Sequence, residues 1–137
     1  MIVLDEQLKN AGLEEQISRW YRGRVVNITS LRPSTVIKDD AIPLLLRQVP
    51  DSTFVTINIA DFWRRVAPDR QFCMACFLLP DERVTEVSDL LRRLFRLPQF
   101  KSKQARRGKI IRVSQTQVQF YAAGDNNQVH LLAWPEP

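Results

Sequence analysis

Short apolar segments alternate with amphipathic segments along the first hundred residues, and this alternation restricts the fold more than any other feature. The predicted strands are residues 2–4, 25–29, 53–57 and 72–79, and the predicted helices are residues 8–20, 39–47, 61–66 and 84–97. Strands that alternate with helices form βαβ units, which build a mostly parallel sheet with helices on both faces.

The end of the chain contains three further predicted strands, residues 109–113, 118–122 and 129–133. The last two are joined across residues 123–127, whose Gly, Asp and Asn residues favour a hairpin. We therefore expect an α/β fold with three α/β/α layers, a mostly parallel central sheet and antiparallel C-terminal strands.

The size of the chain fits one domain. Its 137 residues are 45% hydrophobic, which is enough for an ordinary core, and no repeat or linker divides residues 1–137. No apolar run approaches the roughly 18–20 residues that span a bilayer. The first residues, Met1-Ile-Val-Leu-Asp-Glu6, lack the basic and apolar regions of a signal peptide. These features predict a cytoplasmic protein with no membrane partner.

Two cysteines, Cys73 and Cys76, have the C-x-x-C spacing of a redox pair or of half a zinc site. The residues around them, Phe72 to Leu79, form a continuous apolar strand instead. Residues three apart on a strand point to opposite faces, so we expect the two sulfur atoms to diverge and to pack in the core.

The positive charge is concentrated in the second part of the chain. Residues 62–137 hold 13 Lys/Arg against 7 Asp/Glu, whereas residues 1–61 hold 7 against 8. No acidic residue lies between Asp89 and Asp125. Such a distribution suits a protein that holds cations in one region and a polyanion in another, although a solvated helix face with a basic loop gives the same pattern.

Four aspartates fall where functional groups collect in a parallel sheet, beyond the carboxyl ends of the strands. Asp5 follows the first predicted strand, Asp61 follows residues 53–57, and Asp39 and Asp40 begin the helix between them. Carboxylates that meet in one place repel one another unless a cation neutralises them, and Mg²⁺ or Mn²⁺ prefers oxygen ligands. Each aspartate taken singly also fits a helix cap or a turn.

Three segments resemble PIN-like nucleases. Val3-Leu-Asp5-Glu-Gln-Leu8 is similar to the first strand of that family, which an aspartate ends, and Asp39-Asp-Ala-Ile42 resembles an acidic position at a helix start. Thr56-Ile-Asn-Ile-Ala-Asp-Phe62 is similar to the T-x-N-x-x-D-F segment of VapC-type toxins. The basic helix and Gly108-Lys-Ile-Ile-Arg-Val113 resemble a short, largely uncharacterised PIN-like family, so that the likeness extends over most of the chain.

The resemblance implies a metal-dependent ribonuclease, which in this family is often the toxin of a toxin–antitoxin pair. Asp5, Asp39 or Asp40, and Asp61 would bind Mg²⁺ or Mn²⁺, and Thr56 and Asn58 would shape the same edge. The partners that this implies are RNA and an antitoxin protein, and a homodimer is one open oligomeric state.

The sequence departs from the family pattern at one point. VapC-type enzymes usually carry another acidic residue, commonly Glu, on a helix before the third acid, but no Glu occurs between Glu15 and Glu82. The alternative function is therefore a catalytically degenerate PIN-like module that binds nucleic acid or a protein partner through its basic C-terminal half.

The basic stretch supplies candidate phosphate contacts for either function. These residues are Arg92, Arg93, Arg96, Lys101, Lys103, Arg106 and Arg107. Contacts of this kind give an affinity that depends on salt and not on base sequence. Phe100, next to Lys101, either stacks on an unpaired base or closes the end of the preceding helix onto the core.

Overall fold

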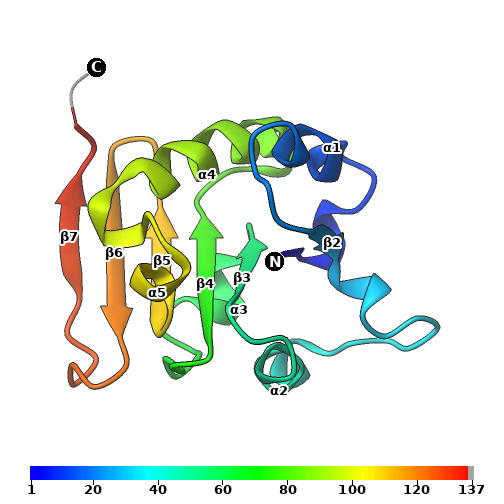
Figure 1. Cartoon of the computed structure of the whole chain (residues 1–137), viewed down its shortest axis with the longest axis horizontal. Coiled ribbons are helices and arrows are strands. Elements are labelled where there is room, and N and C mark those ends of the chain that lie inside the picture. The colour runs from blue at the N-terminus through cyan, green and yellow to red at the C-terminus, as the bar shows by residue number, and fades with distance from the viewer. Residues whose placement is uncertain (136–137) are drawn as a thin grey trace.

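A computed structural model describes residues 1–135, in which seven strands form one mixed sheet (Figure 1). The strands are β1 (Ile2–Leu4), β2 (Val25–Asn27), β3 (Ser52–Thr56), β4 (Phe72–Phe77), β5 (Lys109–Val113), β6 (Gln117–Ala122) and β7 (His130–Ala133). Their order in the sheet is β2-β1-β3-β4-β5-β6-β7. The first five are parallel, and β6 and β7 add antiparallel pairs at one edge. The predicted α/β fold with a mostly parallel sheet and antiparallel C-terminal strands is confirmed.

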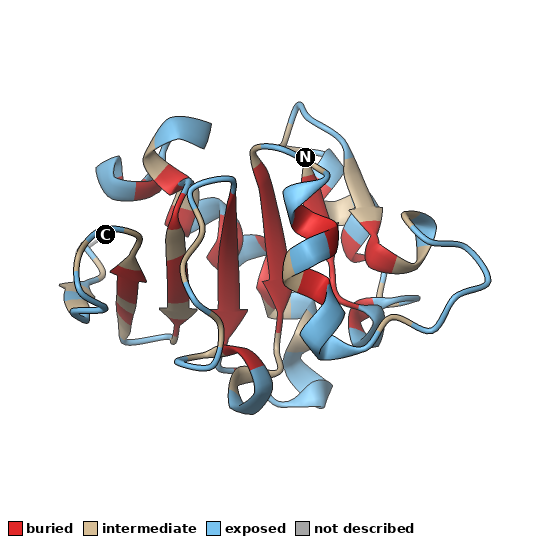
Figure 2. Ribbon diagram, turned by 90° about the horizontal axis from the view of Figure 1, so that it is seen from below, coloured by how far each residue is buried: buried red, intermediate tan, exposed pale blue. Residues whose placement is uncertain are grey.

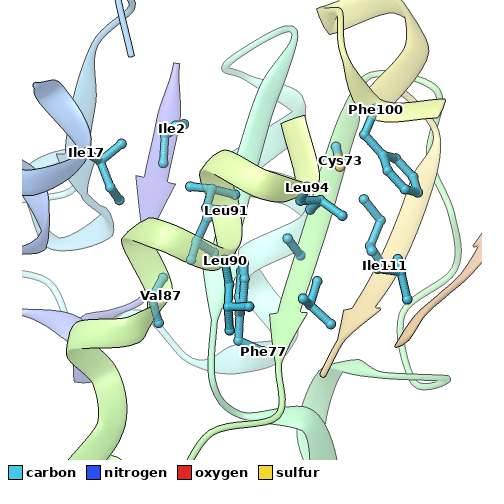
Figure 3. Packing of buried hydrophobic residues seen from close by; sticks show 14 of the residues in the cluster. Ile2, Ile17, Cys73, Phe77, Val87, Leu90, Leu91, Leu94, Phe100 and Ile111 are labelled. Carbon is cyan, nitrogen blue, oxygen red and sulfur yellow. The ribbon is translucent and has the colours of Figure 1, made fainter. Parts of the chain in front are cut away.

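Helices pack on both faces of the sheet. They are α1 (Leu13–Ser18), α2 (Ile42–Arg47), α3 (Ile59–Phe62), α4 (Val87–Arg96) and α5 (Lys103–Arg106). One apolar cluster joins the sheet to α1 and α4, and Figure 3 shows Leu91 and Leu94 of α4 pointing towards the strands. A second cluster joins the opposite face to α2 and α3 through Ile42, Leu46 and Phe62.

The central strands β3 and β4 are buried along their whole length, whereas the edge strands are only partly covered (Figure 2). This burial explains why residues 72–77 form an unbroken apolar run and do not alternate with polar residues. Cys73 packs in the cluster below α4, and Cys76 packs in the cluster on the other face. The prediction that the two sulfur atoms diverge is confirmed, and both thiols are free.

The first predicted helix is shorter than expected. Residues 8–20 contain only α1, because Asn10 and Gly12 adopt left-handed backbone conformations with φ of 65° and 73° that break the helix before Leu13. The predicted helix at residues 84–97 is likewise divided, since a 3₁₀ segment, Asp81–Glu86, precedes α4.

The strand order reverses between β1 and β3. The chain passes from β1 to β2 on one side of β1 and then returns to β3 on the other side. In open sheets with this arrangement, the connections leave β1 and β3 in opposite directions, and the carboxyl ends of the two strands border a crevice. This crevice is where ligands bind in such folds.

Within residues 1–135, no helix has both the length and the apolar character needed to cross a membrane.

Candidate functional site

Asp5 and Thr56 lie side by side at the reversal of strand order. Asp5 directly follows β1 and is 6% exposed, and Thr56 ends β3 and is fully buried. The Thr56 hydroxyl donates to Oδ2 of Asp5 at 2.6 Å, and the backbone N–H of Glu6 donates to Oδ1 at 2.7 Å. Both carboxylate oxygens of Asp5 are therefore held in place by the chain.

Burial raises the pKa of Asp5, and the charges of Glu6 and Asp61 raise it further. The hydrogen bonds from Thr56 and Glu6 oppose this shift but do not reverse it. Asp5 is thus a carboxyl group whose charged form lies in an unfavourable environment.

Asn58 connects Thr56 to Asp61. The Asn58 backbone N–H donates to Oγ1 of Thr56 at 2.9 Å, and the Asn58 side chain caps the short helix α3 by accepting from the Asp61 N–H at 3.2 Å. Its Nδ2 also donates to Oδ2 of Asp61 at 2.7 Å. This hydrogen bond is the main cause of the lowered pKa of Asp61.

Asp39 reaches the same place from a third segment. It begins the 3₁₀ turn that precedes α2, and it lines the same cleft as Asp61. Partial burial raises the pKa of Asp39, and the charges of Asp5 and Asp61 raise it further.

The oxygen donors at this edge suit a hard cation such as Mg²⁺ or Mn²⁺ in their chemistry. Their arrangement does not make a finished site, because no group of three or more His, Cys, Asp and Glu side chains in residues 1–135 is placed to hold a metal ion. Burial is the main cause of the raised pKa values of Asp5 and Asp39, and the neighbouring carboxylates, which raise these pKa values further, are the feature that fits a cation.

A cleft of about 450 Å³ opens beside these carboxylates, between α2 and the segment after α3. Its polar lining consists of Asp39, Asp40, Asp61, Arg47 and Arg65. Arg47 is already paired with Asp69 at 2.5 Å. The guanidinium group of Arg65 makes no hydrogen bond or ion pair within the described part of the chain, but its charge helps to lower the pKa of Asp61.

Sequence reasoning did not select Arg47 or Arg65. Arg65 follows the candidate ligand Asp61 by four residues, and this proximity was the available signal. Arg47 gave none, because its place in the cleft depends on the packing of α2. Asp40, which the sequence could not separate from Asp39, is exposed and lines the cleft as Asp39 does.

The basic segment that precedes β5 lies at the other end of the sheet, where the parallel strands begin. Since β1 and β5 both belong to the parallel part of the sheet, residues 97–107 lie towards the start of β1, away from Asp5. Burial and the charges of Lys103 and Arg106 lower the pKa of the Met1 amino group at that end. The structure therefore does not bring this segment together with the carboxylates.

The exposed basic residues of this region are Arg92, Arg93, Arg96, Lys101, Lys103 and Arg107. Arg92, Arg93 and Arg96 belong to α4, and the Arg93 guanidinium lies 4.5 Å from the centre of the Trp134 ring. Arg107 forms a 3.2 Å ion pair with Asp51. Arg92 and Arg96 have no such partner among the described residues and remain the more available of the helix arginines.

Arg106 differs from the expectation that it contacts phosphate. It is 5% exposed, and its Nη1 donates to the backbone oxygens of Phe100 and Lys101 at 2.9 and 3.3 Å. Its guanidinium also stacks on Phe95 at 3.9 Å from the ring centre. Phe100 is fully buried against Phe120, which corresponds to the core alternative for this residue.

Comparison of the chain with protein-family models, with curated proteins and with solved structures finds no match.

Proposed function

We propose that this chain is a PIN-like ribonuclease that uses Mg²⁺ or Mn²⁺ to hydrolyse phosphodiester bonds of RNA. The observation that carries the proposal is that Asp39 and Asp61 line one cleft, while hydrogen bonds through Thr56 and Asn58 connect Asp61 to Asp5 at the end of β1. A fold gains nothing in stability by collecting like charges, so the cluster is better explained by a ligand of opposite charge.

Asp5, Asp39 and Asp61 would hold the cation. Such an ion, when bound, polarises a phosphoryl oxygen and lowers the pKa of water. The chain prepares the donors for this role: Thr56 fixes the carboxylate of Asp5, and Asn58 fixes that of Asp61. The pKa of Asp39 is raised, and a cation binds the ionised carboxylate, so binding of the cation would strengthen as the pH rises through that pKa.

The decisive experiment is cleavage of a single-stranded oligoribonucleotide in Mn²⁺ or Mg²⁺. We expect cleavage that stops with EDTA and is abolished in Asp5→Asn and in Asp61→Asn, with both variants folded by circular dichroism. Asp81→Asn, which changes an exposed aspartate outside the cleft, serves as the matched control and keeps full activity. Cleavage that survives EDTA, or that Asp5→Asn leaves unchanged, would overturn the proposal.

A second candidate is a PIN-like module without catalytic activity that binds nucleic acid or a protein partner through its basic half. The absence of a finished metal site from residues 1–135 favours it. It predicts RNA binding without cleavage and no stabilisation by Mn²⁺. A cation at 100 times its Kd would add about 2.7 kcal/mol to the free energy of unfolding. A thermal melt with and without Mn²⁺ therefore separates the two functions without an activity assay.

A role as the toxin of a toxin–antitoxin pair is a narrower form of the first proposal. It requires that expression of the chain arrests growth and that a co-expressed antitoxin relieves the arrest. If Asp5→Asn arrests growth as strongly as the unaltered chain, the toxicity does not come from the proposed nuclease.

A further inference from the structure

Tyr121 holds the segment that follows α3. Its hydroxyl accepts from the backbone N–H of Arg64 at 3.2 Å and donates to the backbone oxygen of Val66 at 2.7 Å. The two bonds bracket Arg65, the residue between them. Tyr121 belongs to β6 and is 2% exposed, so the rigid sheet fixes this short stretch of loop.

Arg64 is bound away from the carboxylates. Its φ of 65° is a left-handed conformation that a residue with a long side chain seldom adopts. Its Nη1 donates to the backbone oxygen of Asn127 at 2.8 Å, and its guanidinium lies 5.3 Å from the centre of the Tyr121 ring. The strained turn therefore commits Arg64 to the turn between β6 and β7 and leaves Arg65 as the arginine of this segment in the acidic cleft.

Arg65 stands beside carboxylates without pairing with them. It lines the cleft together with Asp39, Asp40 and Asp61. Its positive charge helps to lower the pKa of Asp61. No carboxylate oxygen of residues 1–135, however, lies within 4 Å of the Arg65 nitrogen atoms. An exposed arginine with free donors can bind a phosphate through two parallel N–H···O bonds. An anion that approached the carboxylates would meet this group.

We propose that Arg65 binds a phosphate group of a polynucleotide strand lying in the cleft, and that Tyr121 is the positioning residue that holds Arg65 there. The role of this phosphate contact in cleavage rests on the proposed nuclease function, but the contact itself does not require catalysis. The ligand class is a polynucleotide, one of whose backbone phosphates reaches Arg65 in the cleft that Asp39 and Asp61 also line.

The test measures binding and catalysis separately on the full chain. Binding is followed by the fluorescence anisotropy of a labelled single-stranded oligoribonucleotide in EDTA, and catalysis is followed with the same RNA in Mn²⁺. We expect Arg65→Ala to weaken binding and to raise KM by about tenfold or more, with a smaller change in kcat. Arg65→Lys should recover part of the loss because it keeps the charge without the planar fork.

Tyr121→Phe keeps the ring and removes the two hydrogen bonds of the hydroxyl. We expect it to raise KM and Kd by a few fold in a protein that remains folded, which a purely structural role would not do. Arg22→Ala removes an exposed arginine outside the cleft and should bind RNA as the unaltered chain does.

The outcomes distinguish the two proposals. If RNA is cleaved and Arg65→Ala has unchanged Kd and KM, the inference on Arg65 is wrong and the nuclease function stands. If no RNA is cleaved but Arg65→Ala binds about tenfold more weakly than Arg22→Ala, the inference stands and the nuclease function is wrong. If the unaltered chain neither binds nor cleaves RNA, both are wrong.

Discussion

The hydroxyl of Thr56 donates a 2.6 Å hydrogen bond to Oδ2 of Asp5, although the two residues are 51 positions apart in the chain. Each residue lies at the carboxyl end of its strand, and the strands are parallel neighbours. The bond therefore joins β1 to β3 beyond the last backbone pairs, at the point where the strand order reverses. It fixes the carboxylate without neutralising its charge, as a ligand for a cation requires.

Replacement of Thr56 by Val should destabilise the protein by about 1–3 kcal/mol. The new side chain has a similar shape, but it leaves a buried oxygen of Asp5 and the backbone N–H of Asn58 without their partner. The free energy of unfolding, measured by urea denaturation, gives the value directly. Thr56→Ser keeps the hydroxyl and should lose less free energy of unfolding than Thr56→Val. If Thr56→Val were as stable as the unaltered chain, this hydrogen bond would make no net contribution to stability.

Asp5→Asn should be more stable than the unaltered chain at neutral pH, although it lacks the proposed activity. Burial raises the pKa of Asp5 above its value in the unfolded chain. The folded state then binds the proton more tightly, so the stabilising contribution of this group is full below the unfolded pKa and is lost as the pH rises through the folded pKa.

The measurement is a series of urea denaturations from acidic to neutral pH. The difference in free energy of unfolding between Asp5→Asn and the unaltered chain should grow, in favour of Asp5→Asn, through that interval and then level off. Asp81→Asn, at an exposed site, should follow the unaltered chain. A variant that is less stable than the unaltered chain at neutral pH would mean that Asp5 is a structural cap and not a strained ligand.

The alternation of strands and helices was sufficient to predict the sheet and to place Asp5, Asp61 and the Asp39–Asp40 pair at one end of it, whereas Thr56 was selected only through the resemblance to PIN-like nucleases. The placement of the aspartates needed only the rule that parallel strands end together. The cleft that Asp39 and Asp61 share with Arg47 and Arg65 could not be predicted in this way, because it depends on how α2 packs beside the segment after α3.

The position of Arg65 could not be predicted for a different reason. It depends on Tyr121, whose hydroxyl reaches Arg64 across 57 positions of the sequence, and on a left-handed turn at an arginine. No local sequence pattern predicts either feature. The burial of Arg106 was hidden in the same way, since in a basic run an arginine that stacks on Phe95 has the same sequence signal as an exposed one.

Arg106→Ala should destabilise the protein by about 2–4 kcal/mol. The change removes the stacking on Phe95 and leaves the backbone oxygens of Phe100 and Lys101 without their donor. Arg107→Ala is the matched control. Arg107 follows Arg106 directly but makes only a partly exposed ion pair with Asp51, so its replacement should change the free energy of unfolding by about 1 kcal/mol or less. Thermal and urea denaturation of both variants would check this, and similar losses in the two would contradict the assigned roles.

The arginines of α4 should contribute to RNA affinity in a manner that depends on salt. Arg92 and Arg96 are exposed, and each would release counterions if it contacted an RNA phosphate on the face of the sheet that α4 covers, opposite the cleft. For single strands, each such contact contributes roughly 0.7 to the slope of log K against log salt concentration. Arg92→Ala combined with Arg96→Ala should therefore reduce the slope by about 1.4.

The double variant Arg22→Ala with Arg32→Ala removes the same charge from exposed positions elsewhere and should keep the full slope. Equal reductions in the two double variants would show that only net charge matters, and that the face of α4 is not part of the path of the RNA.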